Sequence, residues 1–285
     1  MIANKGIITP NKNQLLVIEK DKLNFWSIAD DKITKEKKLE DSIDIYYTQV
    51  MKIEDIFLIM DLKSSKYFLY DIKSNIIKSI KICTKALLNE FIFQAVNEND
   101  FIIDSRGGNG YFRFDKDRLT IEEFSSILVR KLAPHFRRIE NELFAGTHNI
   151  LYTSNNSEII LFHHRDYDQT KSEIGVYITL EEKKITQFEA PEPIVCVNFF
   201  TGFKDENNTN VCSNVKGCLV ADKIVLCYQH MLYVLDYEGK ILKTRPAKEN
   251  SRYWGLEKLN ENQVLVAELD PNDPEKMFVF EYDIL

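Results

Sequence analysis

The sequence predicts an all-β protein in which one four-stranded unit is repeated. Two observations lead to this fold class. In each unit a tight polar turn follows the first apolar run, at Asn13, Asp55, Asn99, Ser157, Asp222 and Asn262. A carboxylate ends each third run, at Asp30, Asp71, Asp115, Glu181, Asp236 and Glu281. Repeats of roughly 40 residues or more that hold four short strands are typical of β-propeller blades. We therefore predict a six-bladed β-propeller of four-stranded antiparallel blades.

The individual runs have the length and composition of β-strands. They are short and rich in Ile, Phe and Tyr, the residues favoured on pleated, half-buried surfaces. Asn recurs at the first turns because it tolerates left-handed backbone and bonds its own chain. In chain order the expected strands are Gly6–Thr9, Leu15–Ile18, Leu23–Ile28, Ile33–Leu39; Ile45–Val50, Ile56–Met60, Tyr67–Tyr70, Ile76–Ile82; Phe91–Val96, Phe101–Asp104, Tyr111–Phe114, Leu119–Phe124; Ile150–Thr153, Ile159–His163, Ile174–Thr179, Ile185–Phe188; Val195–Phe200, Ile224–Cys227, Met231–Leu235, Ile241–Thr244; and Tyr253–Leu259, Val264–Glu268, Met277–Phe280 and Ile284–Leu285.

The repeats follow one another without a polar linker, so we expect a single β-propeller domain over residues 1–285. Two stretches exceed the length of the unit, and we interpret 125–147 and 201–214 as insertions. The long step from Asp115 to Glu181 leaves a seven-bladed ring as the alternative.

One segment carries a family resemblance. Asp222–Lys243, with its Leu-Tyr-Val-Leu-Asp-Tyr-Glu-Gly-Lys-Ile-Leu core at Leu232–Leu242, resembles the repeats of WD-repeat and quinoprotein-type propellers. The resemblance implies a β-propeller. The Trp-Asp pair of WD repeats and the docking glycines of quinoproteins are absent from the sequence, so no ligand of either family is carried over.

Composition narrows the partner classes. The formal charge is -7 and the pI is near 5.4, which disfavours a general attraction to nucleic acid or to an anionic membrane. No apolar run has the length of a signal peptide or membrane span, so we expect a cytoplasmic protein. The five cysteines form no CxxC pair, which indicates free thiols in a reducing compartment.

A basic sector stands out against this acidic background. In a propeller the loops between second and third strands, and the linkers between blades, emerge on one face, which we call the loop face. Loops of the third and fourth units on this face carry basic residues, and these are the predicted contacts of an acidic protein partner: Arg106, Arg130, Lys131, His135, Arg137, Arg138 and Arg165.

Other chemistry has weaker support in the sequence. His163 and His164 lie near acidic residues, but neighbouring strand residues point to opposite faces, so we predict no metal site. No phosphate-binding loop or nucleophile motif is present, and we predict no cofactor and no catalytic residue.

These observations favour a non-catalytic interaction protein, a scaffold, adaptor or inhibitor that binds a partner through the loop face. The alternative is a propeller hydrolase or lyase that uses His148, His163 or His230 with an acidic residue in the central pocket. Propeller active sites come from distant blades and leave no local motif, so both readings stay open.

The last unit ends early. Ile284–Leu285 start a fourth strand that does not continue, so we expect an open edge at Met277–Glu281 that pairs with a strand of a partner or of a second copy. The alternative is that Met1–Asn4 fold back and cover this edge.

Overall fold

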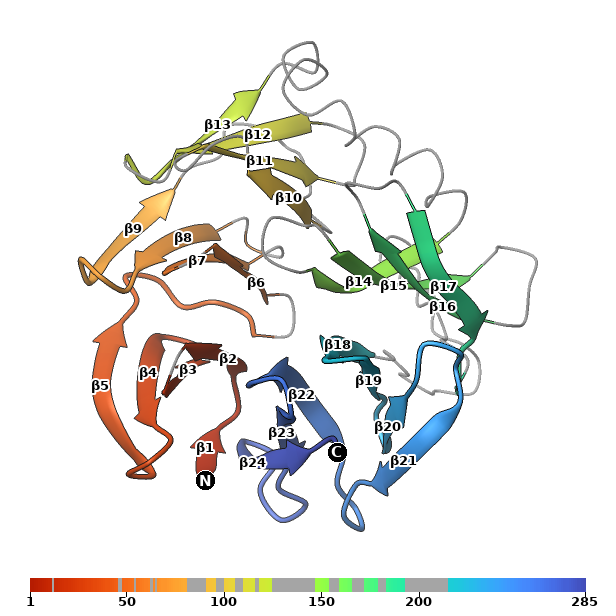
Figure 1. Cartoon of the computed structure of the whole chain (residues 1–285). Coiled ribbons are helices and arrows are strands. Elements are labelled where there is room, and N and C mark those ends of the chain that lie inside the picture. The colour runs from red at the N-terminus through yellow and green to blue at the C-terminus, as the bar shows by residue number, and fades with distance from the viewer. Residues whose placement is uncertain are drawn as a thin grey trace, which may run out of the picture.

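The structure is a computed structural model in which six four-stranded antiparallel sheets are arranged in a ring (Figure 1). It describes residues 1–11, 13–45, 48–53, 55–61, 64, 66–80, 91–95, 100–105, 110–115, 118–124, 147–153, 159–165, 172–178, 183–192 and 215–285. All regular elements in these ranges are strands. The all-β prediction is therefore confirmed. The number of blades in the whole chain stays a prediction, because most of the 125–147 insertion and all of 201–214 lie outside the described residues.

Five sheets are built from consecutive strands, and the first strand of each lies nearest the centre of the ring (Figure 1). Their strands are β2 (Ile7–Asn11), β3 (Gln14–Ile18), β4 (Lys22–Ser27) and β5 (Lys32–Lys38); β6 (Thr48–Ile53), β7 (Ile56–Asp61), β8 (Lys66–Asp71) and β9 (Ile76–Ile80); β10 (Phe91–Ala95), β11 (Asp100–Ser105), β12 (Gly110–Asp115) and β13 (Thr120–Phe124); β14 (Thr147–Thr153), β15 (Ile159–Arg165), β16 (Glu173–Ile178) and β17 (Lys183–Glu189); and β18 (Lys216–Val220), β19 (Lys223–Cys227), β20 (Met231–Leu235) and β21 (Ile241–Pro246). The sixth sheet has the order β22 (Tyr253–Lys258), β23 (Gln263–Leu269), β24 (Lys276–Asp283) and β1 (Ile2–Asn4).

The ring closes through the N-terminus, which corrects the predicted open edge. Ala3 on β1 pairs with Met277 on β24, and the Val279 amide donates to the Met1 carbonyl at 2.9 Å. Ile284 starts no fourth strand, because its side chain is buried against the fifth sheet. The alternative of a folded-back N-terminus is therefore the correct one, and β1 occupies the edge that was expected to pair with a partner's strand.

The first strand of the fifth sheet was also predicted at the wrong place. We expected it at Val195–Phe200, which lies outside the described residues, and the structure places it at β18, directly before the turn at Ala221 and Asp222. The apolar run Gly217–Val220 is short, and the longer run upstream fits the strand pattern better, so the sequence pattern favours the wrong segment. The 201–214 insertion therefore precedes this sheet in the sequence and does not interrupt its first hairpin.

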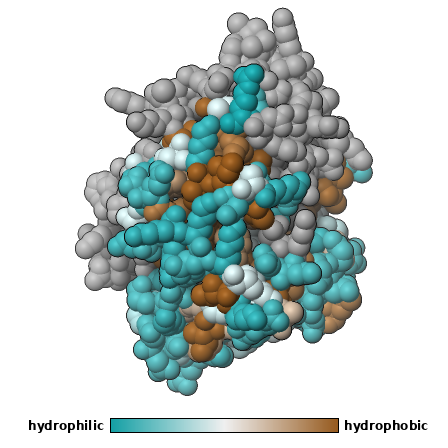
Figure 2. Space-filling view, turned by 90° about the vertical axis from the view of Figure 1, so that its left-hand side faces the viewer, coloured by the Kyte–Doolittle hydropathy of each residue, from teal (hydrophilic) through white to brown (hydrophobic). Residues whose placement is uncertain are grey.

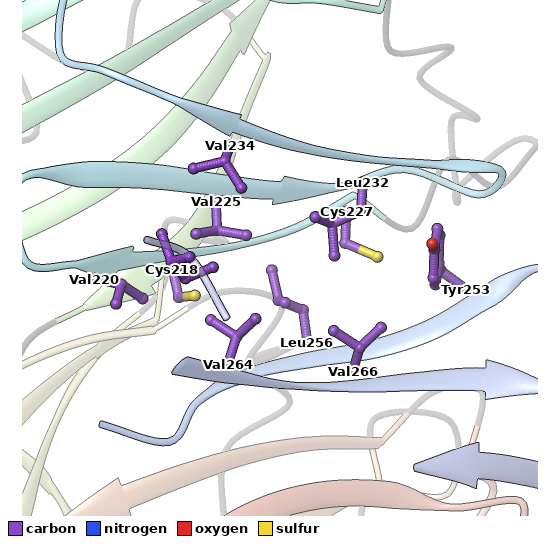
Figure 3. Packing of buried hydrophobic residues seen from close by; sticks show 11 residues of the cluster. Cys218, Val220, Val225, Cys227, Leu232, Val234, Tyr253, Leu256, Val264 and Val266 are labelled. Carbon is purple, nitrogen blue, oxygen red and sulfur yellow. The ribbon is translucent and has the colours of Figure 1, made fainter. Parts of the chain in front are cut away.

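Neighbouring sheets pack face to face and form the core. Figure 3 shows one such layer, in which side chains of the fifth sheet meet Leu256, Val264 and Val266 of the sixth. A second layer joins the sixth sheet to the first through Leu265 and Val17. Middle strands are buried on both faces, and all six residues of β7 are buried. Burial of apolar surface between sheets is thus the main stabilising contribution to the ring.

Outer strands are mostly solvent exposed. The side of the ring formed by β5 and β9 is largely hydrophilic, with apolar patches between the polar side chains (Figure 2). Basic side chains on these strands reach across to the next sheet. The Lys35 ammonium donates to the Tyr70 hydroxyl at 3.2 Å, and the Lys78 ammonium donates to the Arg118 carbonyl at 3.2 Å. Lys35 and Lys78 on the outer strands therefore form hydrogen bonds between neighbouring blades.

The carboxylates predicted at the ends of the third strands are confirmed where they accept hydrogen bonds in the following turn. Asp236 accepts from the Glu238 and Lys240 amides at 2.9 Å, and Asp71 and Asp115 accept from backbone amides of their own turns. Asp30 instead accepts from the Ser27 hydroxyl at 3.0 Å.

The prediction is wrong for Glu281, which lies inside β24 opposite Leu265 and ends no strand. The sixth unit therefore has no carboxylate at the end of its third strand. Glu181, Asn99 and Ser157 lie outside the described residues.

Candidate functional site

Most of the predicted basic sector lies outside the described residues, and those residues are Arg106, Arg130, Lys131, His135, Arg137 and Arg138. Arg165 is the exception. It ends β15 opposite Thr147, the first residue of the innermost strand β14. Asp61 and Glu268 occupy the same register position in their sheets, opposite Thr48 and Tyr253. Arg165 therefore occupies the register position that holds a buried carboxylate in two other sheets.

The carboxylates at this register position bind the linkers that join neighbouring blades. Glu268 is fully buried, and its carboxylate accepts a hydrogen bond from the Lys248 amide in the linker that enters the sixth sheet. The Arg245 guanidinium forms an ion pair with Glu268 at 3.5 Å and also donates to the Tyr253 hydroxyl at 2.9 Å. The same guanidinium lies 4.2 Å from the centre of the Phe280 ring. We call this set the Glu268 clamp.

A second clamp has the same geometry in the second sheet. Asp61, also buried, accepts from the Asp44 amide at 3.0 Å, and Asp44 belongs to the linker that enters this sheet. Its other oxygen accepts from the Ser64 amide at 3.2 Å, so the carboxylate also holds the following loop. Backbone amides that bind a buried carboxylate fix the direction of the chain at that point.

In the fifth sheet a tyrosine takes the role of the carboxylate. The Tyr233 hydroxyl donates to the carboxylate of Glu192, in the entering linker, at 2.9 Å. Burial and the neighbouring Glu192 carboxylate raise the pKa of Tyr233 to about 12, so the hydroxyl keeps its proton at neutral pH. Three linkers of the loop face are thus held by polar groups at their bases.

The histidines of the catalytic alternative lie on β14, on β15 and in the turn between β19 and β20. Strand register pairs His148 with His164 and Asn149 with His163 on β14 and β15. His230 lies in the turn between β19 and β20, and its Nδ1 donates to the Ser251 carbonyl at 3.2 Å. Among the residues that the structure describes, no group of three or more His, Cys, Asp or Glu side chains could hold a metal ion.

A charged cluster that sequence reasoning missed lies on innermost strands. It consists of Lys52 on β6, Lys216 on β18 and Glu257 on β22, and we call it the inner-strand cluster. Burial raises the pKa of Glu257 to about 7, while Lys216 and Lys52 act in the opposite direction. Burial also lowers the pKa of Lys216. Of the three residues only Glu257 lies in an expected innermost strand, Tyr253–Leu259, so no common sequence signal pointed to the cluster.

Cys218 and Cys227 are free thiols buried between the fifth and sixth sheets (Figure 3). Burial raises the pKa of both thiols, so neither is a reactive thiolate at neutral pH.

The described part of the chain contains no helix long and apolar enough to cross a membrane.

Comparison with solved structures bears on the fold. The β-propeller domain of Cps50 (Swd1) from Myceliophthora thermophila superposes with a TM-score of 0.53 at 10% sequence identity, over 98% of this chain and 97% of that one. This chain is a β-propeller.

More distant likenesses include Hsv2p of Kluyveromyces lactis, with a TM-score of 0.49, 7% identity and coverage of 98% and 99% of the two chains. Hydrazine synthase of Kuenenia stuttgartiensis reaches 0.47 at 9% identity, over 91% of this chain and 74% of the other. No family model matches the sequence of this propeller. No curated protein matches it either. At these identities the likeness concerns the fold alone, and function has to be argued from the site.

Proposed function

We propose that this β-propeller is a non-catalytic interaction protein, a scaffold, adaptor or inhibitor, that binds another protein through its loop face. The observation that carries the proposal is the set of linker clamps. The buried or half-buried polar groups of Asp61, Tyr233 and Glu268 form hydrogen bonds with linker residues on this face. Loops that are fixed at their bases lose less conformational entropy when a partner binds them.

The basic sector defines the chemistry of the partner. A local excess of arginine and lysine on a chain with a formal charge of -7 favours an acidic protein surface. Six of the seven residues of the sector belong to stretches between described strands, where propellers carry their binding loops. A cytoplasmic location is part of this proposal, and the free thiols of Cys218 and Cys227 are consistent with it.

Charge reversal tests the proposal. In the test variant Arg130, Lys131, Arg137 and Arg138 are all changed to Glu, and both this variant and the wild-type chain are used as bait in native lysate. The matched control reverses Lys32 and Lys240, two exposed lysines at the turns of the opposite face. We expect the test variant alone to lose an acidic partner, because opposed charges become like charges.

Kinetics on the captured partner sharpen the result. Association with the test variant should be slower and less dependent on salt, with an unchanged melting temperature. Equal capture by wild-type chain and test variant, or loss of the partner only in the opposite-face control, contradicts a loop-face site.

A further inference from the structure

The outer edge of β24 is covered by β1 only along its first half. β1 pairs with Lys276–Phe278, and Met1 exchanges two backbone hydrogen bonds with Val279. On its other side β24 pairs with β23 as far as Asp283. No strand of the described structure pairs with the outer edge of Phe280–Asp283. We call this segment the open half-edge.

The open half-edge is an exception among the sheets that the structure describes. In the first, fourth and fifth sheets every residue of the third strand is paired with the outer strand. In the second and third sheets the outer strand leaves only the first residue of the third strand uncovered. The sixth sheet therefore lacks half of the outer strand that its third strand has room for.

The backbone of the open half-edge directs hydrogen-bonding groups outward. In an antiparallel pair, residues that exchange two hydrogen bonds alternate with residues that exchange none. Val279 exchanges two with the chain on the outer side, so the amides and carbonyls of Glu281 and Asp283 point to that side as well. The amide of Ile284 donates to the inner side, in agreement with this alternation.

The two faces of the open half-edge carry different side chains. Phe280 and Tyr282 are half-buried and pack against the core between the fifth and sixth sheets. Glu281 and Asp283 are exposed on the other face. Asp283 accepts from the Gln263 side-chain amide at 2.8 Å, and neither carboxylate forms an ion pair with a residue that the structure describes. A strand that pairs here would thus meet an aromatic face and an acidic face.

We propose that the open half-edge binds an extended basic segment of a partner protein, which adds a strand antiparallel to β24 and in line with β1 (Figure 1). The main chain of this segment pairs with Glu281 and Asp283, and its basic side chains lie across from their carboxylates. Its apolar side chains lie beside Phe280 and Tyr282. This site is independent of the partner site on the loop face.

Charge favours a basic partner over a second copy of this chain. A second copy that paired through the same segment would place its own carboxylates near Glu281 and Asp283, and like charges across a sheet are destabilising. A basic segment places opposite charges at these positions. Arg245, a cation of this chain near the segment, lies over the Phe280 ring on the other face and is already paired with Glu268. Both carboxylates are therefore available to a partner.

Peptide binding tests the site. The probe is a fluorescein-labelled peptide, Thr-Lys-Val-Lys-Val-Lys-Thr, whose lysines share one face of an extended strand. We expect saturable binding to the wild-type chain by fluorescence anisotropy. The scrambled peptide Lys-Lys-Lys-Thr-Val-Val-Thr has the same charge without the alternation, and it should bind about tenfold more weakly or worse. The analogue with Glu in place of every Lys should bind at least as weakly.

N-methylation of the peptide separates main-chain pairing from charge attraction. Peptide residues across from Glu281 and Asp283 direct their amides toward β24, so methylation of the Lys amides should weaken binding by about tenfold or more. The Val amides point away from β24, and their methylation should change the affinity by less than about twofold. Equal losses for both peptides contradict an added strand in this register.

Charge reversal assigns the site to these two carboxylates. The variant with both Glu281→Lys and Asp283→Lys should bind the Glu analogue better than the Lys peptide, with an unchanged melting temperature because both side chains are exposed. The matched control carries Glu238→Lys and Glu249→Lys, two exposed carboxylates elsewhere on the ring, and should keep the preference of wild type.

Hydrogen exchange on the wild-type chain needs no variant. The amides of Glu281 and Asp283 should exchange quickly in the free chain, and the Lys peptide should slow both by about tenfold or more. The proposal is overturned if the wild-type chain does not bind the Lys peptide, if the scrambled peptide binds equally well, or if the peptide leaves both amides unprotected. A dimer that protects these amides without peptide would identify a second copy as the occupant and overturn it too.

Discussion

Replacing Glu268 by alanine is the sharpest test of the linker clamps. The carboxylate is fully buried, and its loss leaves the Lys248 amide and the Arg245 guanidinium without their acceptor. Removing one member of a buried ion pair costs about 3 to 5 kcal/mol. The Arg245 side chain is 26% exposed and keeps its bond to Tyr253, so part of this cost is recovered. We expect the free energy of unfolding to fall by about 2 to 4 kcal/mol.

Urea denaturation followed by circular dichroism measures this loss directly, and for a chain of 285 residues a fall of that size lowers the melting temperature by about 3 to 7 °C. Glu268→Gln keeps an acceptor for the Lys248 amide and should lie between wild type and Glu268→Ala. The matched control is Glu249→Ala, an exposed carboxylate in the same linker, with an expected change within about 0.5 kcal/mol. A loss below about 1 kcal/mol for Glu268→Ala would refute the structural role assigned to the clamp.

Three further predictions concern other parts of the ring. Asp71→Ala and Asp236→Ala should each lower the free energy of unfolding by about 0.5 to 2 kcal/mol, because each carboxylate accepts from turn amides; unchanged melting curves for both would contradict this. The pKa of Glu257 is raised in the folded chain from 4.5 to about 7, so the folded state binds the proton more tightly. Stability should therefore fall as pH rises between these values, by about 1 to 3 kcal/mol, and the same titration of Glu257→Gln should lack this fall. Hydrogen exchange should show strong protection of the Val279 amide in a dilute monomer, because it donates to Met1, and an amide that exchanges as fast as in an unfolded chain would show that β1 is not docked.

The sequence predicted the local units of the fold well because each strand and turn is encoded within a few residues. The hairpin tips show this most clearly. The carbonyls of Asn13, Asp55 and Asn262 accept from the amides of Ile28, Ile72 and Ile284, so one turn geometry recurs in three sheets. A recurrent Asn or Asp at the same position of each repeat can be recognised from a single sequence.

Contacts between distant segments could not be predicted in the same way. The pairing of β1 with β24 joins opposite ends of the chain, and no local pattern in Met1–Asn4 distinguishes an outer strand from a disordered end. The error at Glu281 arose because an acidic residue near the right spacing was taken for the end of a strand that continues to Asp283.

The clamps left a signal that sequence reasoning did not use. A carboxylate at or near the end of an apolar second strand occurs at Glu19, Asp61 and Glu268, and all three are buried. Such a carboxylate conflicts with the apolar pattern unless it has backbone partners to bind, which is the situation in the structure for Asp61 and Glu268.

Site-specific photo-crosslinking tests the proposed loop-face function most directly. A benzophenone amino acid placed at Glu249, exposed in a linker of the loop face, is compared with one placed at Asn260, exposed at a hairpin tip of the opposite face. After irradiation in native lysate, mass spectrometry identifies the proteins that are attached. We predict that an acidic protein is crosslinked from position 249 and not from position 260. Crosslinking of a protein partner only from position 260, or of none from either position, would contradict binding through the loop face.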